Sequence, residues 1–238
     1  MLYHNLKCHI LVTLDNRKMD RIWINELENF MSDKDCEIFI QMCESNLEKL
    51  KVLSDADDYR IAEGCFLQEN EKTTVSYRDR IAEMLQIPTH NMEDVHLIKY
   101  KVGGEYKEHQ DWFHPRTDYY NSMMERGGQR IKTALVYLND NFTGGDTTFP
   151  RIGMRITPKK GKLVVWDNVT ANGKISYDST HIGEVVTEGV KYIAVIWIRE
   201  KYFWNWDNEK HTWYNTEDRW KNNEWYENLP AHLKVANR

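Results

Sequence analysis

The sequence has no apolar run near the ~20 residues that a membrane-spanning helix needs, and no repeat or low-complexity segment. Its first 14 residues are mildly apolar, but Lys7 and His9 interrupt them and no small-residue cleavage site comes after them. We therefore expect neither a membrane anchor nor a secretory signal. A basic surplus is also lacking, since 32 Lys and Arg face 37 Asp and Glu and the formal net charge is −5. This balance argues against a nucleic-acid partner, although it leaves a local basic groove open.

Cysteine is scarce, and all four cysteines lie in the first third of the chain: Cys8, Cys36, Cys43 and Cys65. They lack the paired spacing of a zinc site, and two of them fall within one predicted helix. We interpret them as reduced thiols of a soluble, intracellular protein, in preference to a disulfide framework.

Apolar residues, in contrast, are plentiful. Hydrophobic residues make up 41% of the 238, enough for the core of one large domain or two small ones. Residues 21–30 predict a strand that enters a turn. Ser32 with Asp35 three residues later is typical of a helix N-cap, and apolar residues then recur at helical spacing to about Leu50. A second helix is predicted over residues 74–85.

After Met92 the pattern changes to short runs rich in β-branched and aromatic residues. These runs predict strands over residues 95–100, 131–138, 162–166, 183–186 and 190–198, with glycine or proline turns between them. Regularly spaced short strands favour a sandwich or a jelly roll. We expect a mainly β fold with a double-stranded β-helix (jelly-roll) core and flanking N-terminal helices. Within one domain overall, residues 1–90 would support the core, residues 91–202 would form it, and residues 203–238 would be an aromatic-rich extension.

A histidine and an aspartate stand two residues apart within the segment 106–113. Alternate side chains of a strand point to the same face, so His109 and Asp111 could reach one metal ion while Gln110 points away. The third ligand must come from elsewhere, because a single strand cannot supply three corners of an octahedron. Alone, the pair is weak evidence, and two polar residues on an exposed strand would be the preferred interpretation.

His181 is the best candidate for the third ligand because of the residues on its C-terminal side. A short strand and a turn at Gly189 lead to Lys191, which begins a strongly apolar strand. Alternation places Lys191, Trp197 and Arg199 on one face of that strand. Cations on a buried face are costly unless an anion meets them, and a cosubstrate carboxylate is such an anion. Two histidines and one carboxylate leave three positions open, which suits Fe(II) oxygenase chemistry.

Five motifs occur in order between Trp23 and Glu200. They are Tyr100-(x)5-Tyr106-x-x-His109-x-Asp111-x-Phe113, Arg130-x-x-Thr133-x-x-x-Tyr137-Leu138-Asn139, Gly144-Gly145-Asp146-Thr147-Thr148-Phe149-Pro150, Pro158-Lys159-Lys160-Gly161 and His181-(x)9-Lys191-(x)5-Trp197. Each is weak alone. Together they resemble the prolyl 4-hydroxylase family of 2-oxoglutarate dioxygenases.

The resemblance implies an Fe(II)- and 2-oxoglutarate-dependent dioxygenase that hydroxylates peptidyl proline at ring carbon 4, forms succinate and uses ascorbate. The implied partner is a proline-containing peptide or protein. The implied iron ligands are His109, Asp111 and His181. Lys191 would bind the distal carboxylate of 2-oxoglutarate, in a pocket that also contains Tyr100, Tyr137 and Thr147. The residues implied near the substrate are Tyr106, Arg130, Trp197 and Arg199. By strict alternation Arg130 lies opposite Thr133, so its role requires a bulge or a strand end.

Three departures from the family pattern concern the substrate. Residues 60–64 read Arg-Ile-Ala-Glu-Gly where the family often has Arg-Thr-Ser before the glycine, Arg199 replaces a histidine of collagen-type relatives, and the tail after residue 203 has no counterpart. Other functions therefore stay open. These are the same iron chemistry on another substrate, as in lysyl or other protein hydroxylases and nucleic-acid demethylases, or an inactive barrel that binds peptides.

Two segments invite structural hypotheses. Residues 114–128 are too long for a hairpin turn, which predicts a lid, a binding segment or a disordered loop. The tryptophans of the tail would staple it onto the barrel, or would form a peptide-binding strap or a dimer contact.

Overall fold

The computed structural model describes residues 6–12, 21–50, 59–67, 71–203, 205–207 and 212–214. Its main element is an eight-stranded sheet. In spatial order its strands are β1 (Leu6–Val12), β2 (Arg21–Leu27), β11 (Leu163–Asp167), β7 (Arg130–Tyr137), β14 (Lys191–Arg199), β5 (His96–Tyr100), β4 (Glu63–Phe66) and β3 (Glu48–Lys49). The second sheet contains β10 (Met154–Ile156), β9 (Thr147–Phe149), β12 (His181–Gly183) and β6 (Tyr106–His109).

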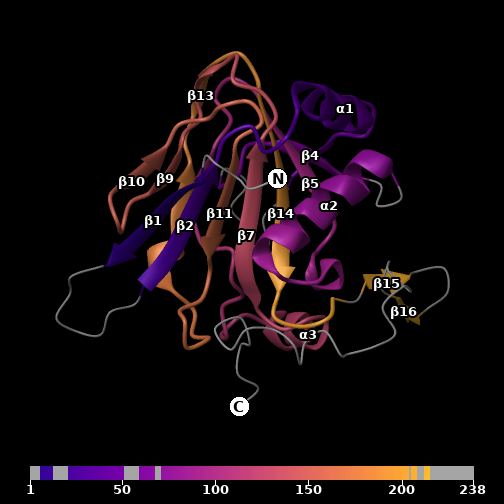
Figure 1. Ribbon diagram of the computed structural model, residues 1–238, viewed down its shortest axis with the longest axis vertical. Coiled ribbons are helices and arrows are strands. Elements are labelled where there is room, and N and C mark those ends of the chain that lie inside the picture. The colour runs from indigo at the N-terminus through magenta and orange to yellow at the C-terminus, as the bar shows by residue number, and fades with distance from the viewer. Residues whose placement is uncertain are drawn as a thin grey trace.

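The remaining elements are short strand pairs and helices. β8 (Thr143–Gly144) pairs with β13 (Val186–Glu188), and β15 (Asn205–Asp207) pairs with β16 (Thr212–Tyr214). The helices are α1 (Asp33–Glu44), α2 (Lys72–Leu85) and α3 (Tyr120–Glu125), with single 3-10 turns at η1 (Thr89–Asn91) and η2 (Tyr177–Ser179). Helices α1 and α2 lie together against one face of the large sheet (Figure 1).

Alternation along β14 separates two hydrophobic cores. Its residues 194, 196 and 198 pack with Phe39 of α1 and Ile81 of α2, whereas residues 193, 195 and 197 pack with Phe149 of β9 and Trp166 of β11. Side chains of a strand point to opposite faces in turn, so helices cover one face of the large sheet and the smaller sheet covers the other. The predicted mainly β jelly roll with flanking N-terminal helices is confirmed.

Two predicted element boundaries are wrong. Ser32 caps α1 as expected, since its Oγ accepts the Asp35 N–H at 3.1 Å, but the helix ends at Glu44 and not near Leu50. Residues 48 and 49 instead form β3, because they pair with β4 at the sheet edge. The strand expected over 183–186 is also two strands, β12 and β13. Glu184 and Val185 cross between them and bond through the backbone to residues 146 and 145.

The prediction of four reduced thiols is wrong for two of them. Cys43 at the end of α1 forms a disulfide with Cys65 of β4, with Cα atoms 5.9 Å apart, while Cys36 is free and buried. The sequence separation of 22 residues hid this pair, because the two cysteines become neighbours only when β4 joins the sheet beneath α1. The side chain of Cys8 lies outside the described residues.

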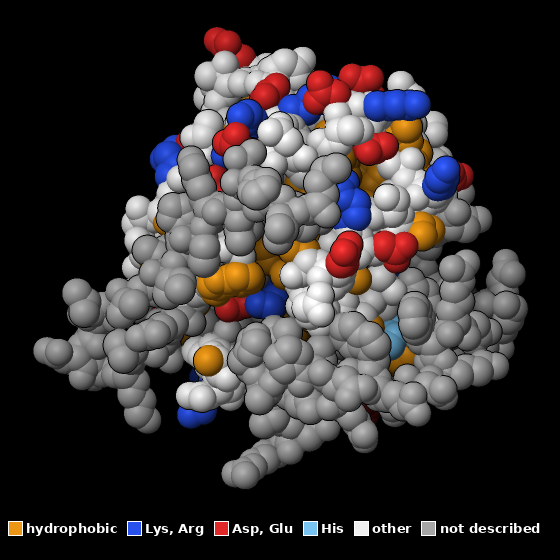
Figure 2. Space-filling view, in the orientation of Figure 1, with side chains coloured by type: hydrophobic (Ala, Val, Ile, Leu, Met, Phe, Trp, Pro, Cys, Tyr) orange, Lys and Arg blue, Asp and Glu red, His pale blue; other side chains and the backbone are white. Residues whose placement is uncertain are grey.

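The described surface, residues 114–128 and the C-terminal tail give little indication of function. Acidic and basic side chains are interspersed over the described part of the face in Figure 2. Ion pairs of the described residues include Lys99–Glu44 and Lys160–Glu37. No helix among the described residues is long and apolar enough to cross a membrane. Residues 114–128 form turns around α3. Of the tail, only the β15–β16 pair is described, so the predicted packing of its tryptophans lies outside the described residues.

Candidate active site

Three buried side chains meet between β6 and β12. His109 ends β6, Asp111 stands two residues beyond it, and His181 begins β12 directly opposite His109 in the antiparallel ladder. One ligand atom from each lies within 4.8 Å of the others, and the three side chains are at most 8% exposed. The strand stops at His109, yet Asp111 still lies beside it as alternation predicted.

Backbone carbonyls orient both imidazoles. His109 Nδ1 lies 2.7 Å from the Lys107 carbonyl oxygen, and His181 Nδ1 lies 2.9 Å from that of Ser179. A carbonyl oxygen only accepts, so each Nδ1 donates this hydrogen bond and each Nε2 is the ring nitrogen that faces a metal. These Nε2 atoms face the Asp111 carboxylate at 3.9 and 3.8 Å. A metal ion between these atoms would be coordinated by all three side chains.

The charge states also suit a metal. Burial, together with the neighbouring His181, holds the pKa of His109 well below its usual value, so its imidazole is neutral. Burial alone would raise the pKa of Asp111, but the two histidines and a hydrogen bond from Thr133 lower it overall. Thr133 Oγ1 donates to Asp111 Oδ2 at 2.6 Å, and Asn168 Nδ2 donates to Thr133 at 2.8 Å. Two imidazoles with their Nε2 atoms turned toward one fixed carboxylate fit the facial ligand set of Fe(II) oxygenases.

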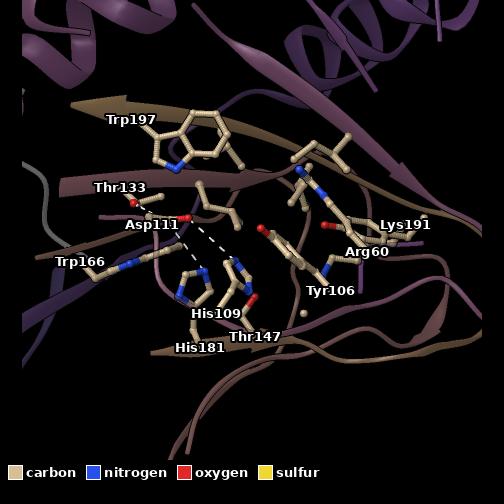
Figure 3. Close-up of a pocket in the computed structure, with 16 residues that line it drawn as sticks. Arg60, Tyr106, His109, Asp111, Thr133, Thr147, Trp166, His181, Lys191 and Trp197 are labelled. Atoms are coloured by element: carbon tan, nitrogen blue, oxygen red, sulfur yellow. Dashed lines mark hydrogen bonds and ion pairs between the residues drawn. The ribbon is translucent and has the colours of Figure 1, made fainter. Parts of the chain in front are cut away.

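A cavity opens beside the three ligands (Figure 3), with about 430 Å³ of empty space when its part open to solvent is included. Its lining comes from both sheets: Arg60, Ile98, Tyr100, Tyr106, His109, Asp111, Thr133, Leu135, Thr147, Trp166, His181, Gly183, Lys191, Ile193, Val195 and Trp197. Many of these side chains are apolar or aromatic, so the cavity keeps water away from the ligands on most sides.

One end of the cavity carries a buried cation. Lys191 is 2% exposed and donates to the Gly145 carbonyl at 2.6 Å, and no carboxylate among the described residues lies within ion-pair distance of it. The rings of Tyr100 and Tyr137 lie 5.2 and 5.6 Å from Nζ. Tyr137 does not line the cavity but donates to Thr147 Oγ1 at 2.7 Å, which fixes that lining hydroxyl. This end is therefore suited to the carboxylate of a small dicarboxylic acid.

The affinity for such a dicarboxylate should depend on pH through Lys191. Burial lowers the pKa of Lys191 to about 8, although Asp146 and Glu184 oppose the shift. Below about pH 8 the ammonium is already charged, whereas above it binding must take up a proton. The affinity for 2-oxoglutarate should thus fall by up to about tenfold per pH unit above 8. Titration calorimetry on metal-loaded protein checks this, and Lys191→Met should abolish the pH dependence; constant affinity from about pH 7.5 to 9.5 in the unmodified protein would contradict it.

Aromatic side chains line other parts of the cavity. The Tyr106 ring stacks on the His109 imidazole with centroids 3.4 Å apart. Trp197 lies at the far end of β14 from Lys191, whereas Tyr106 and Arg60 lie on the Lys191 side in Figure 3. Arg60 was not among the predicted site residues, yet it lines the cavity and its guanidinium lies 4.6 Å from the Tyr106 ring centroid. A signal was present in the sequence, because Arg60 begins the segment 60–64 that matches a substrate-facing strand of the family.

Arg130 and Arg199 do not line the cavity. Arg130 reaches the cavity side because the register of β7 against β14 shifts between Ile198 and Arg199, which is the bulge that its predicted role required. It stacks on Trp197 at 3.9 Å and forms two hydrogen bonds of 2.7 Å with Glu93. Arg199 is 1% exposed and its guanidinium is bonded within the protein. The structure therefore does not support direct substrate contact by Arg199.

Comparisons with known proteins agree with this site. The model of the 2OG-Fe(II) oxygenase superfamily matches residues 95–199. A putative prolyl 4-hydroxylase of Acanthamoeba polyphaga mimivirus is 31% identical over 179 residues, 74% of this chain and 74% of the relative. Probable prolyl 4-hydroxylase 7 of Arabidopsis thaliana is 30% identical over 202 residues, 74% of this chain and 62% of that protein.

A solved structure shares the fold. The viral collagen prolyl hydroxylase from Paramecium bursaria Chlorella virus 1, in complex with 2OG, matches with a TM-score of 0.60 at 27% identity, and the match covers 74% of this chain and 95% of that one. Sequence, fold and ligand geometry agree. The chain belongs to the prolyl 4-hydroxylase family of the 2OG-Fe(II) oxygenase superfamily.

Proposed function

We propose that this 2-oxoglutarate dioxygenase hydroxylates peptidyl proline at ring carbon 4, with ascorbate sustaining its activity. One observation carries the proposal: a single cavity is lined by the buried triad His109, Asp111 and His181, by the buried Lys191 and by several aromatic rings. Relatives similar to this chain are named prolyl 4-hydroxylases. The substrate would be a peptide or protein, because the cavity beside the triad is partly open to solvent.

Each end of the cavity would have its own task. Bound Fe(II) would supply the oxidation, in which one atom of O2 enters succinate as 2-oxoglutarate loses CO2 and the other enters a C–H bond. His109, Asp111 and His181 would hold the metal. The Lys191 ammonium would bind the distal carboxylate, where a charge-assisted hydrogen bond in a buried site is stronger than in water. Thr147 would offer its hydroxyl to the same carboxylate.

Aromatic side chains beside the triad would receive the proline. Tyr106 and Trp197 each provide a flat apolar surface for a pyrrolidine ring, and Tyr106 lies against a metal-ligand candidate. Arg60 would donate to a peptide carbonyl, because it lines the cavity beside Tyr106. Arg130 would act from behind, by holding the indole of Trp197 in place.

The residues present favour this function over its alternatives. An inactive barrel should have lost part of the set, whereas three ligands and Lys191 are all in place. Nucleic-acid demethylases of this class commonly bind 2-oxoglutarate with arginine, and the matching position here is lysine. A lysyl substrate would need an anion near its ammonium, whereas the charged residues that line the cavity, apart from the metal-ligand candidate Asp111, are the cations Arg60 and Lys191.

A peptide panel tests the proposal. Protein with Fe(II), 2-oxoglutarate and ascorbate should add about 16 Da to Pro-Gly repeats or other proline-rich peptides, and amino-acid analysis should identify 4-hydroxyproline. Matched peptides with alanine in place of proline should stay unmodified. Hydroxylation of a lysine panel with none on the proline panel would overturn the proline assignment but leave the iron chemistry intact.

A further inference from the structure

Arg199 ends β14 at the position where collagen-type relatives carry histidine. Its side chain is 1% exposed, and it is one of the largest fully buried side chains of the described residues. A buried arginine keeps its charge, because its pKa lies far above neutral pH, so the fold must supply partners for all of its donors. Those partners show what the arginine does here.

The guanidinium of Arg199 holds the end of helix α3. Its Nε and Nη2 donate to the Gly128 carbonyl at 3.0 and 2.7 Å, and Nη2 also donates to the Met123 carbonyl at 2.5 Å. Nη1 donates to Glu93 at 3.0 Å. Two carbonyls at the C-terminal side of α3 thus accept from one side chain that is anchored in the central sheet. A histidine has two ring nitrogens and could not reach all three partners.

Glu93 connects Arg199 to the cavity wall. Its carboxylate also accepts two hydrogen bonds from Arg130, which stacks on Trp197. Burial would raise the pKa of Glu93, but the two arginines lower it overall, so the carboxylate stays charged. Both guanidinium groups also lie under 5 Å from the Phe113 ring centroid, two residues after the metal ligand Asp111.

The segment between Asp111 and β7 is fastened at both ends. The Phe113 N–H donates to Gln129 Oε1 at 2.6 Å, and Gln129 Nε2 donates to the Phe113 carbonyl at 2.9 Å. The Gln129 side-chain amide thus forms the same two hydrogen bonds with the Phe113 backbone that a neighbouring strand would form. The Gln129 N–H in turn donates to Glu200 at 3.2 Å. Residues 112–128 therefore leave and rejoin the core at one place. Arg199 bonds to the segment at Met123 and Gly128.

We propose that Arg199 is a positioning residue, which holds residues 112–128 rigidly behind Asp111 and Trp197 and does not itself touch substrate. These residues do not line the cavity, so loosening them would act through Glu93 and Arg130 on the indole of Trp197. It should weaken peptide binding and spare 2-oxoglutarate, whose lysine lies at the other end of β14. This last consequence rests on the proposed function; the rigidity of the segment does not.

The test compares Arg199→His with Arg116→His, the same change at an exposed arginine of the same segment. In Arg199→His, amide hydrogen exchange over residues 119–128 should accelerate by about tenfold or more, because several charge-assisted bonds are lost. The KM for peptide should rise about fivefold to tenfold while the KM for 2-oxoglutarate stays within about twofold. Arg116→His should change none of the three.

A second variant keeps the proposal testable if Arg199→His does not fold. Arg199→Lys retains the charge beside Glu93 but cannot bond both carbonyls, so it should show the same local exchange with a smaller amplitude. Unchanged exchange over 119–128 in the folded variants would overturn the clamp. Faster exchange with an unaltered peptide KM would overturn the positioning role. A protein that hydroxylates no proline peptide would refute the proposed function, while the exchange data would still decide the clamp.

Discussion

Replacing His181 with alanine is expected to reduce both Fe(II) affinity and 2-oxoglutarate turnover by more than about a hundredfold. Loss of a side chain that merely supports a metal ligand costs about 10–100-fold, and His181 would be a ligand itself. Its Nε2 is the atom through which β12 would hold the metal, since its Nδ1 is committed to the Ser179 carbonyl. Anaerobic Fe(II) titration and a succinate assay measure the two effects, and His109→Ala should behave alike.

The control is another histidine of the same neighbourhood. His114 stands three residues after Asp111, is partly exposed, and accepts the Arg116 N–H with its Nδ1. His114→Ala should bind Fe(II) like the unmodified protein. If His181→Ala kept Fe(II) affinity and turnover within about threefold while remaining folded, the assignment of the triad as the metal site would be wrong.

Replacing Lys191 with methionine is expected to weaken 2-oxoglutarate binding by about a hundredfold, with Fe(II) affinity unchanged. Truncating one partner of a buried, hydrogen-bonded charge pair costs about 2–5 kcal/mol, and a tenfold change corresponds to about 1.4 kcal/mol. Methionine nearly keeps the length of the side chain, so the loss reports the charge and its hydrogen bonds. Calorimetric titration of metal-loaded protein with 2-oxoglutarate measures it.

The Lys191→Met variant is expected to lose 2-oxoglutarate affinity without losing stability in the absence of ligand. Without ligand, the charged Lys191 is buried with only a carbonyl as acceptor, which lowers its pKa and destabilises the folded state. Lys191→Met should therefore unfold at the same temperature as the ligand-free protein or higher. Lys99→Met is the matched control, because Lys99 lies on the adjacent β5 and pairs with Glu44 outside the cavity. A drop in 2-oxoglutarate affinity of equal size in both variants would refute a specific role of Lys191.

Local pattern predicted the parts of the site that lie along single strands. Alternation placed Lys191 and Trp197 on one face of β14, and spacing placed His109 beside Asp111; the structure has both. Partners from distant segments were not predictable in this way. Thr133 and Asn168 support Asp111 from β7 and from the end of β11, and Arg60 enters from an isolated bridge to Tyr106.

Arg130 and Arg199 show why alternation alone was insufficient at one point. Ile198 pairs with Lys132 but Arg199 pairs with Arg130, so β7 has one extra residue at this place. An added residue turns a strand's faces over, and the shift therefore brings Arg130 toward Trp197. Arg199 shares Glu93 with Arg130, but it lies beyond the cavity and bonds to the carbonyls near α3. Strand pairing also explains why residues 48 and 49, which were predicted to be helical, form a strand.

The sequence by itself determined the chemistry of this protein: the ligand types, their spacing, the lysine ten residues after His181, and the order of motifs that marks the family. The tertiary structure alone decided which side chains share the cavity, which arginine faces it, and which cysteines pair. The physical reason is that ligand chemistry and strand period are local properties, whereas strand register and the packing of distant segments are set by hydrogen bonds and buried surface formed only on folding.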